Sequence, residues 1–257
     1  MYLIDSHCHL NFDGLADRLP EVFANMRAQQ VGQALAISVS WESFAEVFAI
    51  AENNGHIFCT IGVHPDRRDA AEFSVAEMVA QARHPKVVGI GETGLDYYWC
   101  KGDLAWQHRR FADHIQAANE AGLPVVVHTR DAAADTLRLL KECNTRAGVI
   151  HCFSEDVAFA KAALDLGLYI SFSGIVTFKN APLIQEAAKY VPADRMLVET
   201  DSPFLAPVPK RGKPNEPSYV RYTAEFLAKL RGETLEQIAE TTTENFYRLF
   251  SKVPRIA

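Results

Sequence analysis

The chain has 257 residues, of which 48% are hydrophobic, and 32 acidic against 26 basic residues give a formal net charge of −6. This balance excludes a disordered or collagen-like chain, and a chain of this length can fold without disulfide staples. The negative charge argues against a broad basic face that grips duplex DNA, because non-specific duplex binding depends on neutralising phosphates.

Eight short apolar segments rich in β-branched residues predict β-strands. They are residues 2–4, 34–39, 57–61, 87–90, 124–127, 148–150, 168–172 and 196–198. Segments with helical spacing lie between them, and their predicted buried faces are Leu104, Phe111, Ile115 and Ala118, then Leu137, Leu140 and Lys141, then Ala158, Ala162 and Leu166, with Gly167 as a stop signal.

Alternating strands and helices predict parallel pairing, and eight strands predict a single-domain TIM (β/α)8 barrel over residues 1–257. Residues 216–250 carry two helical patterns without a new strand, so we expect them to close the barrel from outside. The Pro- and Gly-rich segment 203–217 is the long irregular connection, and loops of this length are often functional.

The sequence has five cysteines and no CxxC pair, and they are Cys8, Cys59, Cys100, Cys143 and Cys152. An odd number without regular spacing predicts reduced thiols in a reducing compartment. The sequence has no basic leader and no run of ~18–20 apolar residues. We therefore expect a cytoplasmic protein that binds no membrane, needs no obligate protein partner and is monomeric.

Ligand-type side chains follow five of the predicted strands, one of which carries two. They are His7, His9, Glu92, His128, His151 and Asp201. Barrel enzymes build their active sites at this rim. Because residues i and i+2 of a strand point to the same side, His7 and His9 can both face the barrel axis while Cys8 faces the outer helices.

Four imidazoles and two carboxylates are too many for one tetrahedral site with an open position. They fit two divalent metals ~3.5–4 Å apart that share a carboxylate. A lone HxH arises by chance, and His128 could be a core histidine, but five strand ends with such side chains favour a metal centre. Zn, Mn, Mg, Co and Ni all remain open as the metal.

The motifs DSHCHL, GVHP, GETGLDYY, VHTRDA, HCFSE and ETDSPFLAPVPKRGKPNEP resemble, in this order, those of the TatD family of metal-dependent deoxyribonucleases, and most closely its YcfH-type branch. The resemblance extends from Asp5 to about Leu249 and implies a distorted TIM barrel of the amidohydrolase-like type with two metals. It implies that one metal is held by His7, His9 and Asp201, the other by His128 and His151, and that Glu92 bridges them. Related cyclic amidases usually bridge with a carboxylated lysine, so Glu92 argues against that branch.

Asp201 and Glu92 are the candidate catalytic residues, and Asp201 is the better candidate to orient the attacking water or accept its proton. Arg130 follows His128 by two residues and can bind phosphate through its guanidinium. Arg211 and His64 are further candidate substrate-binding residues. The alternative for each of these two is an ordinary loop residue.

We expect Asp5 and Glu199 to hydrogen-bond the ligating histidines, and Asp96 to orient a ligand or contact substrate. A strand cap, a rim charge and a turn residue are the respective alternatives. Aromatic residues near the strand ends could stack on a single-stranded base, although packing under the loops is the alternative for most of them. They are Tyr97, Tyr98, Trp99, Phe153, Phe172 and Phe178.

The sequence thus favours a metal-dependent hydrolase that cleaves DNA phosphodiester bonds. A barrel mouth admits a single-stranded end more easily than a duplex, so we expect a 3′–5′ exonuclease whose partners are nucleic-acid ends or a small phosphodiester. The same metals could serve another ester or amide, as in an aminoacyl-tRNA deacylase, a lactonase or an amidase. A non-enzymatic barrel with a vestigial metal site is the remaining alternative, against which the complete ligand set weighs.

Overall fold

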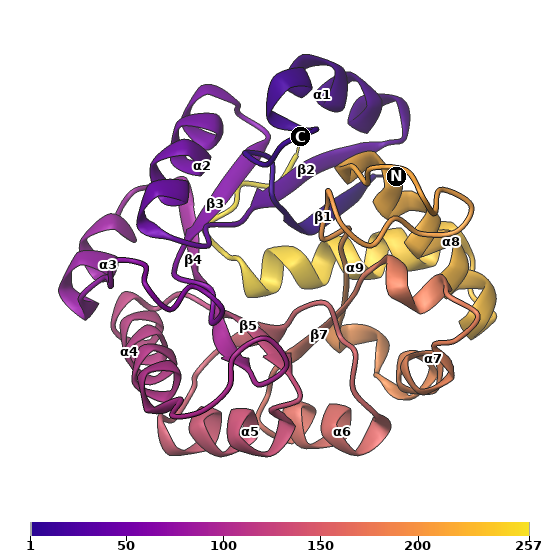
Figure 1. The fold of residues 1–257 in the computed structure, drawn as a ribbon. Coiled ribbons are helices and arrows are strands. Elements are labelled where there is room, and N and C mark those ends of the chain that lie inside the picture. The colour runs from indigo at the N-terminus through magenta and orange to yellow at the C-terminus, as the bar shows by residue number, and fades with distance from the viewer. Residues whose placement is uncertain (1, 257) are drawn as a thin grey trace.

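Eight parallel strands form one barrel, and helices surround it (Figure 1). The computed structural model describes residues 2–256. The strands are β1 Leu3–Cys8, β2 Val31–Ala36, β3 Ile57–Ile61, β4 Val87–Asp96, β5 Val125–Arg130, β6 Gly148–Ile150, β7 Tyr169–Phe172 and β8 Met196–Val198. The helices are α1 Leu19–Ala28, α2 Trp41–Asn53, α3 Val75–Gln81, α4 Ala105–Ala121, α5 Ala133–Glu142, α6 Val157–Asp165, α7 Pro182–Tyr190, α8 Val220–Arg231 and α9 Leu235–Leu249. The predicted TIM barrel is confirmed.

Each strand hydrogen-bonds to the next in chain order, but the ring between β8 and β1 closes by a few contacts beyond the end of β8. The backbone N–H of His9 donates to the carbonyl of Ser202 at 2.8 Å, and that of Asp201 donates to the carbonyl of His7 at 2.9 Å. The barrel is therefore distorted at this seam, and the same contacts hold Asp201 beside the end of β1.

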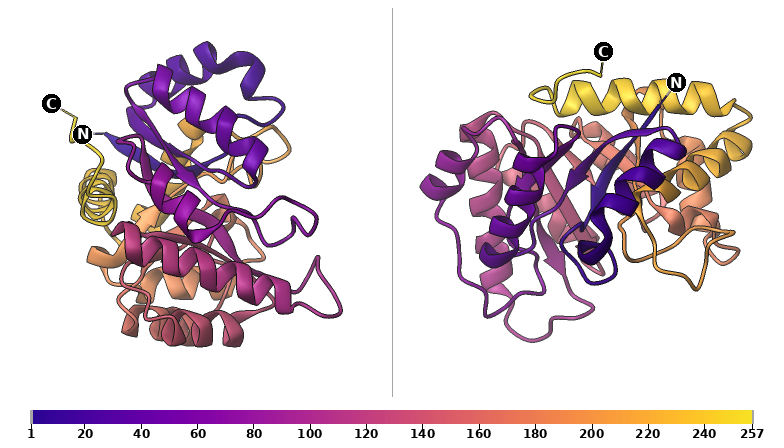
Figure 2. Two further views of the ribbon diagram at one scale, coloured as in Figure 1. Left: turned by 90° about the vertical axis from the view of Figure 1, so that its left-hand side faces the viewer. Right: turned by 90° about the horizontal axis from the view of Figure 1, so that it is seen from above.

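The barrel interior is packed by one inward side chain from each strand together with aromatic side chains of α9. Helix α9 runs across the end of the barrel opposite the long loops, as Figure 2 shows. Phe246 of α9 and Phe250, the residue after its last turn, are buried in this inner core. The inward side chains are Ile4, Leu35, Phe58, Val88, Val126, Val149, Tyr169 and Leu197.

The C-terminal helices divide the role expected of residues 216–250. Helix α8 packs beside the barrel, whereas α9 closes its bottom, because Phe246 of α9 and Phe250 just after it pack against the inward side chains of the strands. The ammonium of Lys252, just after α9, donates to three carbonyls near the start of β4, those of Ala82, His84 and Val87. These contacts attach the C-terminal segment to the barrel floor.

Capping and stop residues in the sequence mark the ends of α2 and α6, whereas apolar spacing predicts the buried faces of the helices less accurately. Ser40 and Ser43 form a capping box at the start of α2, and Gly167 follows α6 with φ +83°, as its stop signal predicts. Two predicted positions are wrong, because Lys141 and Ala158 are exposed. In α5, Leu140 is buried and Leu137 packs against the core, as predicted, and the other buried positions are Thr136 and Leu139. The buried positions of α6 are Phe159, Ala160 and Ala163.

Strands β1, β4 and β5 extend farther than their apolar segments predict, through the polar motifs that follow. Histidines and carboxylates therefore lie on extended backbone with fixed alternation rather than on free loops. Among the described residues, no helix is long and apolar enough to cross a bilayer.

Candidate metal centre

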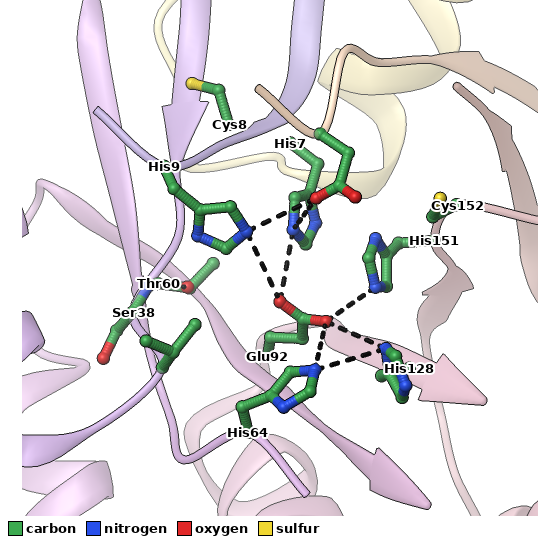
Figure 3. Close-up of polar contacts among 12 residues, drawn as sticks. His7, Cys8, His9, Ser38, Thr60, His64, Glu92, His128, His151 and Cys152 are labelled. Atoms are coloured by element: carbon green, nitrogen blue, oxygen red, sulfur yellow. Dashed lines mark hydrogen bonds and ion pairs between the residues drawn. The ribbon is translucent and has the colours of Figure 1, made fainter. Parts of the chain in front are cut away.

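The six predicted ligands come together at the carboxyl end of the barrel, and all of them except the fully buried His7 border a cavity of about 570 Å³. Figure 3 shows the imidazoles of His7, His9, His128 and His151 arranged around the carboxylate of Glu92. His7 and His9 both point inward, and the thiol of Cys8 between them donates to the carbonyl of Leu35 in the neighbouring strand. The prediction from the HxH spacing is confirmed.

Glu92 is the centre of the cluster, and its two oxygens face different histidines (Figure 3). Oε2 lies 3.3 Å from Nε2 of His7 and 3.9 Å from Nε2 of His9. Oε1 lies 2.7 Å from Nε2 of His151 and 3.2 Å from Nδ1 of His128. One carboxylate oxygen is thus directed to each half of the site.

Asp201 completes the half that contains His7 and His9. Its Oδ1 lies 3.4 Å from Nε2 of His9 and 3.6 Å from Nε2 of His7. Asp201 has φ +55°, an unusual conformation for a non-glycine residue that is typical of functional sites. Its side chain is 14% exposed, so it is accessible from the cavity while Glu92 is buried beneath.

The donor set fits a divalent cation. Buried imidazole nitrogens normally have a hydrogen-bond partner, but Nε2 of His7 and Nε2 of His151 have none of proper geometry. Ligand atoms fall into three groups that lie within 4.8 Å of one another: His7, His9 and Asp201; His7, Glu92 and His151; and His64, Glu92 and His128. Imidazole and carboxylate donors of this kind suit Zn and its neighbours in the transition series.

The charges of the cluster support one another. Burial by itself would raise the pKa of Glu92, but the imidazoles of His151, His64 and His7 outweigh it and hold this pKa well below its usual range. Burial likewise opposes the charge on Asp201, and the hydrogen bond from His9 together with His7 lowers its pKa. Both carboxylates are therefore ionised at neutral pH, as metal ligands must be.

Three acidic residues support the ligands, in two different ways. Glu199 accepts from Nδ1 of His151 at 3.3 Å, and Asp96 lies 3.1 Å from Nε2 of His128, so each fixes the imidazole that it contacts. Asp5 contacts no ligand imidazole. Asp5 precedes His7 by two residues on β1, deeper in the barrel than the ligands. Its carboxylate accepts hydrogen bonds from the N–H and the hydroxyl of Thr200 and from the backbone N–H of His7.

His64 belongs to the cluster more directly than the sequence predicts. Its Nε2 lies 3.2 Å from Oε1 of Glu92 and 3.3 Å from Nδ1 of His128, and its Nδ1 lies 2.7 Å from Asp66. Burial opposes its protonation, but Glu92 and Asp66 outweigh burial and raise the pKa of His64 to about 9. The GVHP motif indicated a rim position, but it gave no sign that His64 shares the carboxylate of Glu92.

One face of α4 holds the backbone around His64 through three buried polar side chains. Gln107 donates to the carbonyl of Pro65 at 2.8 Å, Arg110 donates to the carbonyl of His64 at 3.0 Å, and His114 accepts from the N–H of Val63 at 3.1 Å. These residues are Gln107, Arg110 and His114, and we refer to them as the α4 clamp. The α4 clamp was not predicted from the sequence. Its three polar residues are spaced by three and four positions, which places them on one face of the helix and could have indicated a buried polar face.

The two predicted phosphate-binding arginines differ in position. Arg130 borders the cavity, with its guanidinium 4.0 Å from the ring centre of Tyr98 and 5.5 Å from that of Trp99. Arg211 lies over the ring of Phe178 at 3.8 Å and is not among the residues that line the cavity. The structure therefore brings Arg130, but not Arg211, to the cluster.

Only some of the aromatic residues that were predicted to stack on a base lie at the cavity. Phe153 and Phe172 are buried in the core and cannot stack on a ligand, and Tyr97 is hydrogen-bonded to His108 and Asp135. Trp99 lines the cavity. Two further aromatic residues that the sequence did not single out line it as well, Phe12 and Phe204.

The thiols take no part in the ligand set. Within the described residues all five cysteines are free, which agrees with the expectation of reduced thiols. Cys152 lines the cavity rather than the core, and its thiol lies 3.2 Å from the hydroxyl of Ser173. Burial raises its pKa well above the usual range, so it is protonated and unreactive at neutral pH.

An eight-stranded parallel barrel whose mouth holds this set of imidazoles and carboxylates defines a metal-dependent hydrolase. The sequence model of the family described as TatD related DNase matches residues 4–251, and the chain belongs to this family. It is 45% identical to the uncharacterized metal-dependent hydrolase YcfH of Escherichia coli strain K12, over 97% of this chain and 96% of that protein.

Two further comparisons agree. The chain is 41% identical to the uncharacterized metal-dependent hydrolase YabD of Bacillus subtilis strain 168, over 96% of this chain and 98% of that one. Its structure is similar to the crystal structure of YJJV, a TatD homolog from Escherichia coli K12, with a TM-score of 0.91, 28% identity and 98% of each chain covered.

Proposed function

We propose that this chain is a metal-dependent phosphodiesterase that removes nucleotides from the 3′ ends of single-stranded DNA. The observation that carries the proposal is the split carboxylate of Glu92, whose Oε2 faces His7 and whose Oε1 faces His151. A carboxylate placed between two groups of imidazoles could serve two divalent cations, and two-metal sites are used for phosphodiester hydrolysis.

In this proposal the protein holds two divalent cations per chain. His7, His9 and Asp201 would hold one of them, His128 and His151 would hold the other, and Glu92 would be shared between them. Such cations lower the pKa of a coordinated water and polarise a phosphoryl oxygen. Glu199 and Asp96 keep the imidazoles of His151 and His128 in the orientation that presents the free nitrogen to the site.

Asp201 has the position of a general base. Its carboxylate is ionised and partly exposed to the cavity, whereas Glu92 is enclosed by imidazoles. We propose that Asp201 orients the attacking water and accepts its proton. General-base catalysis of this kind contributes typically 10²–10⁴-fold to a rate.

Phosphate and strand-end recognition are supported by the shape and charge of the mouth. Arg130 borders the cavity two residues beyond His128, where its guanidinium can bind a phosphate bidentately. A cavity of about 570 Å³ is in the range of small-ligand sites and accepts a nucleotide more readily than a double helix. Both features favour DNA ends over a neutral lactone or amide.

A metal-dependent activity panel tests the proposal. The purified protein is supplied in turn with Mg²⁺, Mn²⁺ and Zn²⁺, and is given single-stranded DNA labelled at either end, duplex DNA, RNA, an aminoacyl ester and a lactam. We expect stepwise shortening of single-stranded DNA from the 3′ end, abolished by a chelator. Hydrolysis of the aminoacyl ester or lactam with no cleavage of DNA would overturn it in favour of that activity.

A further inference from the structure

Large apolar side chains are exposed at the cavity mouth. Trp99, on the loop after β4, is 65% exposed, and Phe204, on the loop after β8, is 51% exposed. Both line the cavity. In a ring of eight strands β4 and β8 lie diametrically opposite, so the two rings face the cavity from opposite sides. Apolar surface that is exposed beside a cavity is available for contact with a ligand.

The Phe204 side of the mouth is continuous with the metal ligands. Phe12 stacks on the imidazole of His9 with 4.7 Å between ring centres, and Phe204 packs edge-on against Phe12 at 6.0 Å. Phe204 is therefore held in place by neighbours, while about half of its surface stays open. A ring fixed in this way can receive a flat ligand without losing much conformational freedom.

The Trp99 side combines aromatic surface with an available positive charge. The guanidinium of Arg130 lies against the rings of Tyr98 and Trp99. Within residues 2–256, no carboxylate is within ion-pair distance of it, so its donors are free for an anion. An aromatic face and an unpaired guanidinium side by side match the two parts of a nucleotide, its base and its phosphate.

We infer that Trp99 and Phe204 form a base-binding subsite that holds the last two bases of a single DNA strand, with the phosphate between them bound to Arg130. The inference rests on the proposed function and states what recognises its substrate. Stacking accepts any base, because every base has an aromatic face, so the subsite selects unpaired ends rather than a sequence. Bases within a duplex already stack on one another and would have to be splayed apart first.

Paired substrates test the subsite. One is a single-stranded oligodeoxynucleotide, and the other is the same chain without bases on its last two 3′ nucleotides. We expect the wild type to show a KM about a hundredfold higher for the base-free substrate, because two stacking contacts of about tenfold each are lost. Trp99→Ala and Phe204→Ala should each raise KM for the normal oligonucleotide by about tenfold, change kcat by less than about twofold, and leave KM for the base-free one unchanged.

Two variants serve as controls. Trp99→Phe keeps an aromatic face and should recover most of the affinity. Tyr190→Ala removes an exposed aromatic residue at the far end of α7, away from the mouth, and should behave as wild type. Equal cleavage of the two substrates by the wild type, or a KM effect of Trp99→Ala on both, would overturn the subsite while the nuclease activity stands.

Two other results are distinguishable. Cleavage of neither oligonucleotide would overturn the proposed function and the subsite with it. If Trp99→Ala weakened the binding of an aromatic ester and left the KM for DNA unchanged, the aromatic walls would serve a different substrate class, and the base-binding subsite would be wrong.

Discussion

His114 accepts a hydrogen bond from the backbone N–H of Val63 at 3.1 Å, which fixes the chain next to His64 in the cluster. The acceptor must be a neutral imidazole, since Nδ1–H is already used as the donor to the carbonyl of Arg110 at 2.8 Å. Burial lowers the pKa of His114 to about 4. An unfolded histidine has a pKa of about 6.5, so protonation of His114 favours the unfolded state.

This difference predicts a pH-dependent loss of stability. The contribution of neutral His114 is fully present above about pH 6.5 and is lost as the pH falls toward 4, by roughly 3 kcal/mol over the whole window. His114→Gln keeps an acceptor and a donor but does not titrate. In urea unfolding at pH 7, 5.5 and 4.5, the free-energy difference between wild type and variant should shrink with falling pH. Parallel curves would contradict the prediction.

Gln107→Met tests the α4 clamp from another residue. The change removes a buried amide that donates to the carbonyl of Pro65 and accepts from the N–H of Asp96, leaving the Asp96 N–H without this acceptor and the Pro65 carbonyl with only the weak thiol donor of Cys100. We expect a loss of about 1–3 kcal/mol in unfolding free energy and a fall in kcat/KM of roughly tenfold. Gln116→Met, the same substitution on the exposed face of α4, is the control and should change either quantity little. Similar losses in both variants would remove the special role of Gln107.

Glu92→Gln tests the shared carboxylate. The amide has the same shape but lacks the charge that balances the surrounding imidazoles, so we expect fewer than one metal per chain instead of two after dialysis. The rate should fall by on the order of 10²–10³-fold. Metal content is measured by elemental analysis beside thermal unfolding. A chelator should lower the melting temperature of the wild type and leave that of the variant almost unchanged.

Asp201→Asn separates metal binding from proton transfer. An asparagine oxygen can still be a weak ligand but cannot accept a proton, so we expect the rate to fall by about 10²–10⁴-fold while at least one metal per chain is retained. Rate and metal content must be determined on the same sample. Near wild-type turnover with metals bound would show that another group accepts the proton.

Gly94→Ala tests the close approach of β4 to β5. Gly94 has φ +142°, and a Cβ atom there would overlap the carbonyl oxygen of His128. We expect a loss of roughly 3 kcal/mol or more in unfolding free energy, from backbone strain together with the displaced strand. Gly102→Ala is the matched control, because it has φ +88° in open space and should cost only roughly 1 kcal/mol. Equal losses would show that strain alone, and not the contact with His128, matters.

The strand ends were predictable because a parallel barrel gathers them at one rim, whatever their separation in sequence. His7 and His9 could be placed from the period of two, and Glu92, His128 and His151 from the apolar runs before them. Asp201 follows a strand of only three residues, and the seam between β8 and β1 positions it beside His7.

Other features needed the folded chain. The role of Gln107 depends on a backbone 42 residues away, and no local pattern identifies that partner. The faces of α5 and α6 were wrong at Lys141 and Ala158, because short apolar runs fit a helical period in more than one phase. Helix α9 has an ordinary amphipathic sequence, and only its contact with the inner core shows that it, rather than α8, closes the barrel.

The closure by α9 has a geometric consequence. The inward side chains of the strands, with Phe246 and Phe250 beneath them, fill the barrel axis below the ligand cluster. A DNA strand therefore cannot pass through the barrel. A strand end that enters the cavity must leave on the side from which it came, and the product must be released before the rest of the strand can move further in. Under the proposed function, the DNA strand would be cleaved stepwise from a free end, with release of product after each step.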